Sequence, residues 1–408
     1  MLRSILILFL TAAGVQAGGI ALSVDGVADY ALKHNPTLAA ARLRIEEARG
    51  RVQQSGRLRN PELEIEFTRI QPGPEGALTA ALMQRFPLNA RLRHERAVSR
   101  AELAAVDAEV RDGERKLAAE AQTLAVEIIA SRGQRALRAR QQENSLELSR
   151  FLQKRVESGE AASVDAAQVE LETEQLELEL LQLTATELEH AGELRALLGV
   201  TGDVTVTGEL AGVVSKRLPS AAALAERPDV RAAEHRVSAA QAAAQQQRAS
   251  RWDDVGVGAI YGADRDVDDP SPVETRQVFG VKVSIPLPLW NNNAGRIREA
   301  EAAAARAALE ADAVRFTATN EISGAHGDMI AHARLVTALD TKLLPKAAAI
   351  EEQIRQQYSA GQSPLTEVLR ARSRRLDLQR QRLDALRDYH LARVRYEAGA
   401  NVPKGGAR

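Results

Sequence analysis

The sequence contains no cysteine among its 408 residues. This absence excludes disulfide bonds and thiolate metal sites, and it leaves no cysteine for an N-terminal lipid anchor. Aromatic residues make up only 3% of the chain, which is too few for an ordinary aromatic-rich core. The 54 basic and 55 acidic residues nearly cancel, so we expect no basic surface for nucleic acid.

Long hydrophobic runs are also missing beyond the N-terminal segment. No later stretch approaches the ~20 apolar residues of a membrane helix, so any membrane span must consist of strands. Residues 1–17 carry Arg3, the apolar core Ile5–Leu10 and the small residue Ala17, which together are typical of a secretory signal. We expect cleavage after Ala17 and an unacylated mature N-terminus at Gly18.

The abundant residues, alanine, glutamate, arginine, leucine and glutamine, are typical of long helices and coiled coils. One stretch changes its period from strand to helix. Up to Ile285 apolar residues alternate with small or polar ones, which predicts a strand, and Pro286 then prevents further pairing. From Arg296 an alanine-rich, charged pattern predicts a long helix that Asn291–Asn293 can cap. The same change occurs at Pro87.

The chain contains an internal duplication. Corresponding residues recur at separations of 192, 199 and 202: Pro36 and Pro228, Pro87 and Pro286, and Gly159 and Gly361. Each half is expected to contain a broken helix, a strand hairpin, a long helix, a glycine turn and a second long helix. The first broken helix is expected at Leu22–Lys33, capped by Ser23, and Thr37–Ser55, and the second at Leu218–Ser250.

These elements define the expected organisation. The signal peptide occupies 1–17, the first repeat 18–212, the second repeat 213–402 and the C-terminal tail 403–408. The hairpins are expected at 62–86 and 254–285, and the long helices at 91–156, 163–198, 294–358 and 364–398. Seven-residue spacings such as Val169, Leu176 and Leu183 predict antiparallel coiled coils. The helix 91–156 would be about 100 Å long at a rise of ~1.5 Å per residue.

Four strands per chain cannot close a barrel by themselves. In hydrocarbon an unpaired strand edge would leave backbone groups unsatisfied, at roughly several kcal/mol each. Three chains supplying twelve strands are an economical way to enclose an aqueous lumen. The predicted fold class is therefore mainly α with a β-barrel contribution, assembled as a homotrimer. The alternative is an ordinary soluble sheet at the end of a helical rod.

Several features identify the family that the chain resembles. They are the duplication, Asn35-Pro36, Arg227-Pro228-Asp229, the segment Ser284–Trp290 (SIPLPLW) and the two glycine turns. Together these resemble the TolC-like outer-membrane efflux proteins over essentially the whole mature chain. The resemblance implies a trimer in which a twelve-stranded outer-membrane barrel continues into a periplasmic barrel of α-helices. Residues 59–63 and 285–291 look most like the outer-membrane components of cobalt–zinc–cadmium efflux systems.

The resemblance also implies a function. The chain would be a passive exit duct of a tripartite efflux pump, in the outer membrane of a Gram-negative bacterium with a long periplasmic portion. Its partners would be a periplasmic adaptor protein, an inner-membrane RND transporter and outer-membrane lipid. The cargo would be small solutes, with heavy-metal cations among them. Two alternatives remain, a type I secretion duct for polypeptides and a periplasmic coiled-coil scaffold without a pore.

A gate and adaptor-binding tip are implied at the two glycine turns. The matching residues are Gly159, Asp165, Tyr358, Gly361, Glu367 and Arg370. The family's latch arginine falls on Ser363 and a second aperture acid falls on Arg370, so the carboxylate ring is expected either to be weaker or to use Glu367 alone. Three such carboxylates near a three-fold axis would repel one another and attract cations. The alternative is that Glu367 is a solvated first-turn residue favoured by the helix dipole.

Nothing in the sequence indicates an enzyme or a bound cofactor, because no catalytic triad order, phosphate loop or zinc-protease motif occurs. His326, Met329 and His332 share one helical face and are weak candidates for a metal site. No cysteine or tightly placed carboxylate completes that set, and a conduit that holds its cargo conducts poorly.

Three glutamates alternate with apolar residues along one predicted strand, at Glu62, Glu64 and Glu66. If the apolar residues between them face lipid, the glutamates face the barrel lumen and favour cations. The alternative is that they form the exposed face of a soluble strand.

Overall fold

A computed structural model describes residues 19–69, 75–160, 162–210, 212–213, 226–266 and 274–400. The signal peptide, the tail 403–408 and the predicted helical arm at 218–225 lie outside these described residues. The chain forms two compact units, of which unit 1 draws on Met1–Ala40, Asp112–Arg227 and Thr317–Arg408. Unit 2 draws on Ala41–Arg111 and Pro228–Phe316. Each unit thus takes segments from both halves of the sequence.

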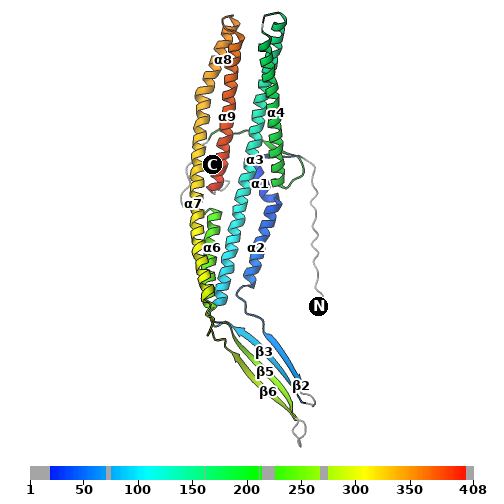
Figure 1. The fold of residues 1–408 in the computed structure, drawn as a ribbon, viewed down its shortest axis with the longest axis vertical. Coiled ribbons are helices and arrows are strands. Elements are labelled where there is room, and N and C mark those ends of the chain that lie inside the picture. The colour runs from blue at the N-terminus through cyan, green and yellow to red at the C-terminus, as the bar shows by residue number, and fades with distance from the viewer. Residues whose placement is uncertain are drawn as a thin grey trace. The chain divides into compact units, whose positions relative to one another are not determined.

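The described part of the chain is mainly helical, which confirms the mainly α part of the predicted fold class (Figure 1). Its helices are α1 (Val24–His34), α2 (Pro36–Gln54), α3 (Arg91–Glu157), α4 (Ser163–Leu198), α6 (Pro228–Ala249), α7 (Ala294–Ala338), α8 (Leu344–Ser359) and α9 (Leu365–Gly399). In unit 1, α3 pairs with α4 and α8 pairs with α9, each pair joined by a glycine turn (Figure 1).

Unit 2 contains an antiparallel four-stranded sheet. Its strands are β2 (Glu62–Arg69), β3 (Gly76–Phe86), β5 (Val255–Asp266) and β6 (Glu274–Ser284), in the order β2-β3-β5-β6. The sheet therefore consists of two hairpins placed side by side, one from each half of the sequence. Its outer strands are β2 and β6, whose outer edges pair with no strand in the described part of the chain.

Two further short strands form in unit 1. The strand β1 (Ile20–Ser23) lies parallel to β4 (Val204–Thr207), with Leu22 opposite Val206. The helix predicted from Leu22 therefore begins later, at Val24, because Ile20 and Leu22 alternate into a strand before it. Ser23 caps this helix as expected, since its Oγ accepts a hydrogen bond from the amide of Gly26 at 3.1 Å.

Asn35 and Arg227, which precede the corresponding prolines of the two repeats, form different contacts in unit 1. The Asn35 side chain accepts a hydrogen bond from the amide of Leu38 at 2.7 Å and donates one to the carbonyl of Leu197 at 2.8 Å. The Arg227 guanidinium is buried and donates to a carboxylate oxygen of Glu321 at 2.6 Å. Asn35 thus caps α2 and ties it to the end of α4, whereas Arg227 reaches α7.

The core of unit 1 is built mainly from alanine and aliphatic side chains. One cluster packs α1, α3 and α4 around β4, and includes Val27, Ile128, Leu194, Leu198 and Val206. Two further clusters join the α7 side to α9, and include Ile322, Met329, Leu339, Leu386 and Tyr389. Small side chains allow these helices to approach closely, which explains how a chain with so few aromatic residues builds a core.

The second long helix is interrupted, unlike its counterpart α3. The run predicted as one helix at 294–358 contains a π-turn, Leu339–Leu343, between α7 and α8. Pro345 explains the interruption, because proline has no amide hydrogen and its ring collides with the carbonyl four residues earlier. The amide of Leu344 donates instead to the carbonyl of Leu339, five residues back. Asp340 within the turn is held by Arg382 of α9.

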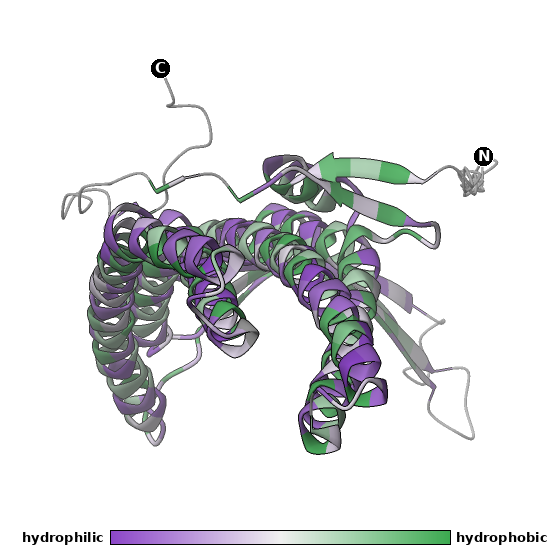
Figure 2. Ribbon diagram, turned by 90° about the horizontal axis from the view of Figure 1, so that it is seen from above, coloured by the Kyte–Doolittle hydropathy of each residue, from purple (hydrophilic) through white to green (hydrophobic). Residues whose placement is uncertain are grey.

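None of the helices in the described ranges has a stretch long and apolar enough to cross a membrane. Hydrophilic and hydrophobic residues are interleaved along each helix, as Figure 2 shows.

Candidate functional site

Two turns of the same geometry reverse the chain in unit 1. Gly159 has a φ of 72° and Gly361 a φ of 73°, in the left-handed region that other residues rarely adopt. No neighbouring atom lies within 4 Å of a Cβ built on either glycine, so the backbone conformation and not space requires glycine. The closing hydrogen bonds run from the Glu160 amide to the Arg155 carbonyl at 2.7 Å, and from the Gln362 amide to the Gln357 carbonyl at 2.8 Å.

The two acidic residues predicted at the tip occupy the same place in their helices. The amide of Asp165 donates to the carbonyl of Ala162, and the amide of Glu367 donates to that of Pro364, both at 3.1 Å. Each carboxylate thus belongs to the first turn of its helix, where the helix dipole favours negative charge.

Arg370 forms an ion pair with Glu367, with Nη1 at 2.7 Å from Oε1. The Arg370 side chain is 77% exposed and that of Glu367 is 44% exposed, so water screens the pair and its contribution to stability is small. The pair places a cation against the carboxylate that is expected to form the aperture ring. Tyr358 lies in the last turn of α8, and its carbonyl accepts a hydrogen bond from the amide of Gly361 at 3.0 Å.

The strand register divides the sheet of unit 2 into two chemically different faces. Residues directly opposite each other share a face, and one face is apolar: Leu63, Leu82, Ala259 and Val281 in one row, and Ile65, Ala80, Tyr261 and Phe279 in the next. The other face carries charge and small residues: Glu62, Met83, Gly258 and Lys282 in one row, and Glu64, Ala81, Ile260 and Gly280 in the next. The three predicted lumen glutamates therefore lie on one face together.

The apolar face of the sheet is exposed. Ile65 is 65%, Phe67 73% and Phe279 76% exposed. A soluble sheet normally covers such a face with a core, so exposed apolar side chains over several strands indicate a partner or a lipid environment. On the opposite face, Glu62 forms an exposed ion pair with Arg85 at 3.3 Å.

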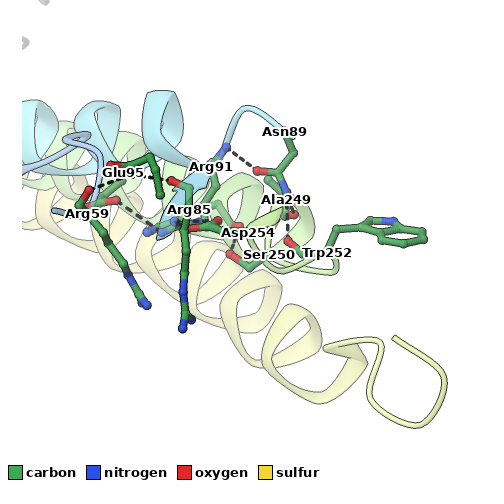
Figure 3. Close-up of polar contacts among 11 residues, drawn as sticks. Arg59, Arg85, Asn89, Arg91, Glu95, Ala249, Ser250, Trp252 and Asp254 are labelled. Carbon is green, nitrogen blue, oxygen red and sulfur yellow. Dashed lines mark hydrogen bonds and ion pairs between the residues drawn. The ribbon is translucent and has the colours of Figure 1, made fainter. Parts of the chain in front are cut away.

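The strands join the helices of unit 2 through a polar clamp (Figure 3). The Asn89 side chain donates to the carbonyls of Ala249 at 2.7 Å and Trp252 at 3.1 Å, and it accepts from the amide of Arg91 at 3.0 Å. One terminal nitrogen of Arg91 donates to both carboxylate oxygens of Asp254, at 2.8 and 3.0 Å. The clamp connects the first turn of α3 to the segment between α6 and β5.

A similar clamp stands at the second joint. The Asn293 side chain donates to the carbonyl of Gln247 at 2.9 Å, and its φ is 61°. The capping role expected of the neighbouring asparagines occurs here, because Asn292 accepts from the amide of Ala294 at 3.2 Å. The sequence analysis did not predict the clamps at Asn89 and Asn293. The signal that could have revealed them is the recurrence of asparagine before both long helices.

Two of the candidates for a metal site, Met329 and His326, contact other residues in the structure. Met329 is 1% exposed and packs in the hydrophobic cluster of α7 and α9. The ring of His326 lies against Tyr396, with the ring centres 5.6 Å apart. In the part of the chain that the structure describes, no group of three histidine, cysteine or acidic residues is placed to hold a metal ion.

The Glu367–Arg370 pair was also missed by the sequence reasoning. Its signal was present, because residues three apart on a helix are neighbours. The structure brings Gly159, Asp165, Tyr358, Gly361, Glu367 and Arg370 to the two helical turns at one end of unit 1 (Figure 1). The glutamates of β2 belong to unit 2.

The second half of the chain matches a known family. The model of the outer membrane efflux protein family matches residues 220–399. The comparison with curated proteins gave no match.

Several solved structures share the fold across nearly the whole chain. CusC has 18% identity and a TM-score of 0.77, with 95% of each chain covered. The outer membrane protein VceC of Vibrio cholerae has 19% identity and a TM-score of 0.75, with 92% of this chain and 95% of that one covered. The open state of the MtrE outer membrane channel of Neisseria gonorrhoeae has 16% identity and a TM-score of 0.77, covering 92% of this chain and 88% of that one.

Proposed function

We propose that the chain is a TolC-like outer-membrane efflux protein and forms the passive exit duct of a tripartite efflux system, which the family match over residues 220–399 and the fold shared with CusC support. The main support for this proposal is the sheet of unit 2. It has one exposed apolar face, one charged face and two outer edges without a partner strand in the described residues. Three copies would pair β2 of one with β6 of the next and close a twelve-stranded barrel, which leaves no open edge in lipid.

In this barrel one face of the sheet would contact lipid and the other would contact water in the lumen. Phe67 and Phe279 belong to the lipid face, and Glu66 and Lys282 to the lumen. The glutamates of β2 give the lumen negative charge, which Lys282 and Arg85 partly offset. A passive duct needs no catalytic group, and the energy for export comes from a partner pump.

The test uses neighbouring residues on opposite faces of β6. A lysine at the lipid face near the bilayer centre costs roughly 2–4 kcal/mol, whereas a lysine in the lumen does not meet lipid. Phe279→Lys should therefore reduce the heat-modifiable trimer recovered from outer membranes. Gly280→Lys is the matched control, because a Cβ at Gly280 meets no atom within 4 Å. Equal recovery of both variants would contradict the barrel.

We further propose that the glycine turns form the periplasmic aperture and receive the adaptor. The pairing of Glu367 with Arg370 gives this proposal a specific electrical test. In single-channel recordings, Glu367→Gln should lower the cation preference and Arg370→Gln should raise it, since the latter leaves the carboxylate unbalanced. Tyr358 matches a tyrosine of the inter-helix latch that the resemblance implies, so Tyr358→Phe tests this role through the open conductance. If none of the three changes conduction, these residues do not line the aperture.

The pump type and the cargo belong to the same proposal. The similarity of residues 59–63 and 285–291 to heavy-metal efflux components supports an RND-type pump exporting divalent cations. Deleting the chain should then increase cellular cobalt, zinc or cadmium, measured by elemental mass spectrometry. Sensitivity to organic drugs alone would point to another pump, and loss of a secreted polypeptide would favour the type I secretion alternative.

A further inference from the structure

The apolar face of the sheet in unit 2 carries charge in one place. Among the residues that the described strands β2, β3, β5 and β6 put on this face, the charged side chains are Arg69 and Arg265. The acidic residues of these strands all lie on the opposite, charged face: Glu62, Glu64, Glu66, Asp264, Asp266 and Glu274. The two arginines therefore stand out on a face whose other strand residues are uncharged.

The two arginines also share one row of the sheet. Arg69 lies opposite Gly76, Gly76 lies opposite Arg265, and Thr275 completes the row on the fourth strand. Neighbouring strands are ~4.8 Å apart, so the Cα atoms of the two arginines are separated by about 10 Å. Both arginines are exposed, and neither forms an ion pair with a carboxylate of the described residues. Two cations in one row attract an anion to the space between them.

Gly76 keeps that space open. It has no side chain, and a Cβ built on it would stand only 2.8 Å from the carbonyl oxygen of Thr68, so a larger residue would require the backbone to shift. The long side chains of Arg69 and Arg265 can therefore converge above the glycine on a group held between them. The planar guanidinium donates paired N–H groups, which match the oxygens of a phosphate.

The arginine row lies at the edge of the apolar band of the sheet. On β3 this band runs from Leu78 to Phe86, a separation of eight residues, which is about 27 Å at ~3.4 Å per residue. With the strand tilt of ~35–45° found in membrane barrels, the band covers about 20 Å of membrane thickness, close to the ~25 Å of such barrels. Gly76 lies two residues beyond Leu78. The row thus falls where hydrocarbon meets headgroups, and there a charge on the lipid face costs little.

The position of the helices decides which leaflet the row faces. The helix α3 follows β3 and α6 precedes β5, so both helices join the sheet at the end of Phe86 and Val255 (Figure 1). The arginine row lies at the other end of the strands. In the proposed duct the helices are periplasmic, which places the row at the outer leaflet. The outer leaflet of a Gram-negative outer membrane consists of lipopolysaccharide, whose lipid A carries phosphate groups.

We propose that Arg69 and Arg265 bind one phosphate group of a lipopolysaccharide molecule on the lipid side of the sheet, in the space above Gly76. Each arginine donates to the phosphate from one side, and the acyl chains of the lipid run along the apolar face below, past Phe67 and Leu78. This inference rests on the proposed outer-membrane duct, and it adds a lipid-binding site that passive export does not require.

The test measures the binding of lipid A to the detergent-purified trimer of the full-length protein by native mass spectrometry. The double variant Arg69→Gln with Arg265→Gln should bind lipid A at least about 10-fold more weakly than the unmodified trimer, because hydrogen bonds from charged donors are lost. Each single variant should show a smaller loss, and it tests the site if the double variant does not assemble. Arg276→Gln is the matched control, because Arg276 lies at the same end of the sheet on the charged face, and it should bind normally. Undiminished binding by the arginine variants of the row, or an equal loss in Arg276→Gln, would overturn the inference.

Two further probes identify the group that is bound. Lipid A from which the phosphates have been removed should bind the unmodified trimer as weakly as intact lipid A binds the double variant. Equal binding of both lipids would show that the acyl chains alone are recognised, and it would overturn the inference. Inorganic phosphate should not displace lipid A, and displacement would assign the site to free phosphate instead. Absence of any trimer in the unmodified protein would instead refute the proposed function.

The depth of the row has its own measurement, which the absence of cysteine makes possible. A spin label on Thr275→Cys, in the arginine row, should be intermediate in its access to oxygen and to a water-soluble relaxant. The references are labels on Phe279→Cys, within the apolar band, and on Arg276→Cys, on the charged face. If the label at position 275 matches either reference, the row does not lie at the headgroups and the inference fails.

Discussion

Replacing Asn35 with alanine removes two hydrogen bonds from one buried side chain. The first, from the Leu38 amide at 2.7 Å, caps α2, and losing such a cap costs about 1 kcal/mol. The second runs to the Leu197 carbonyl at 2.8 Å, and leaving that acceptor unpaired near the core costs about 1 kcal/mol more. The total, about 2 kcal/mol, corresponds to a change of roughly 30-fold in a local opening equilibrium.

The measurement is hydrogen–deuterium exchange of the amide of Leu38, which reports this opening directly. In Asn35→Ala the amide should exchange about 10- to 30-fold faster than in the unmodified protein. Asn35→Asp is the matched control, because its carboxylate still accepts from Leu38 but cannot donate to Leu197. In that variant the Leu38 amide should stay protected, while the melting temperature of the helical circular dichroism signal falls.

If Leu38 exchanges within a factor of two of the unmodified rate in Asn35→Ala, the side chain does not hold the start of α2. Equal exchange in the alanine and aspartate variants would show that the contact with Leu197, and not the cap, controls this region.

Three further predictions concern other parts of the chain. Asp254→Asn should weaken the joint by about 1 kcal/mol, because Arg91 loses its charged partner at a half-buried site, and amide exchange in the segment before β5 should rise; unchanged exchange would refute the clamp. Burial raises the pKa of Asp112, but hydrogen bonds and charge from neighbouring basic groups outweigh it and hold the pKa below its ordinary value. The ionised Asp112 carboxylate therefore stabilises the fold above about pH 4, and this stabilisation is lost as the pH falls through the lower pKa of the folded state. In Asp112→Asn the stability, followed by circular dichroism, should depend less on pH in this acidic range. In Gly399→Ala the new Cβ would stand 2.7 Å from Cγ1 of Ile322. The variant should be less stable, because overpacking costs about 1–3 kcal/mol, whereas replacing glycine by alanine in a helix stabilises by up to ~1 kcal/mol. A higher melting temperature of the variant would contradict this packing.

Much of the candidate tip was predictable because its signals are local. Gly159 and Gly361 mark turns that require a left-handed residue, and the first-turn places of Asp165 and Glu367 follow from their distance to those glycines. The ion pair of Glu367 with Arg370 was overlooked although its spacing is local as well. The matching of both acids to an aperture remains a prediction.

The sequence by itself determined most of the long helices and the strands of the four-stranded sheet. Alternation and proline mark the strands of the sheet, and long alanine-rich, charged patterns with capping residues mark the helices, because each residue's local solvent and backbone preferences suffice for that. Tertiary structure alone decided which distant segments meet: β1 pairs with β4, Asn35 reaches Leu197, and Arg91 reaches Asp254. It also decided that Pro345 produces a π-turn and leaves the helix continuous in its overall path. The physical reason is that the spacing of apolar residues indicates which side of a helix or strand is buried. Which other helix or strand it packs against depends on the packing of the whole chain.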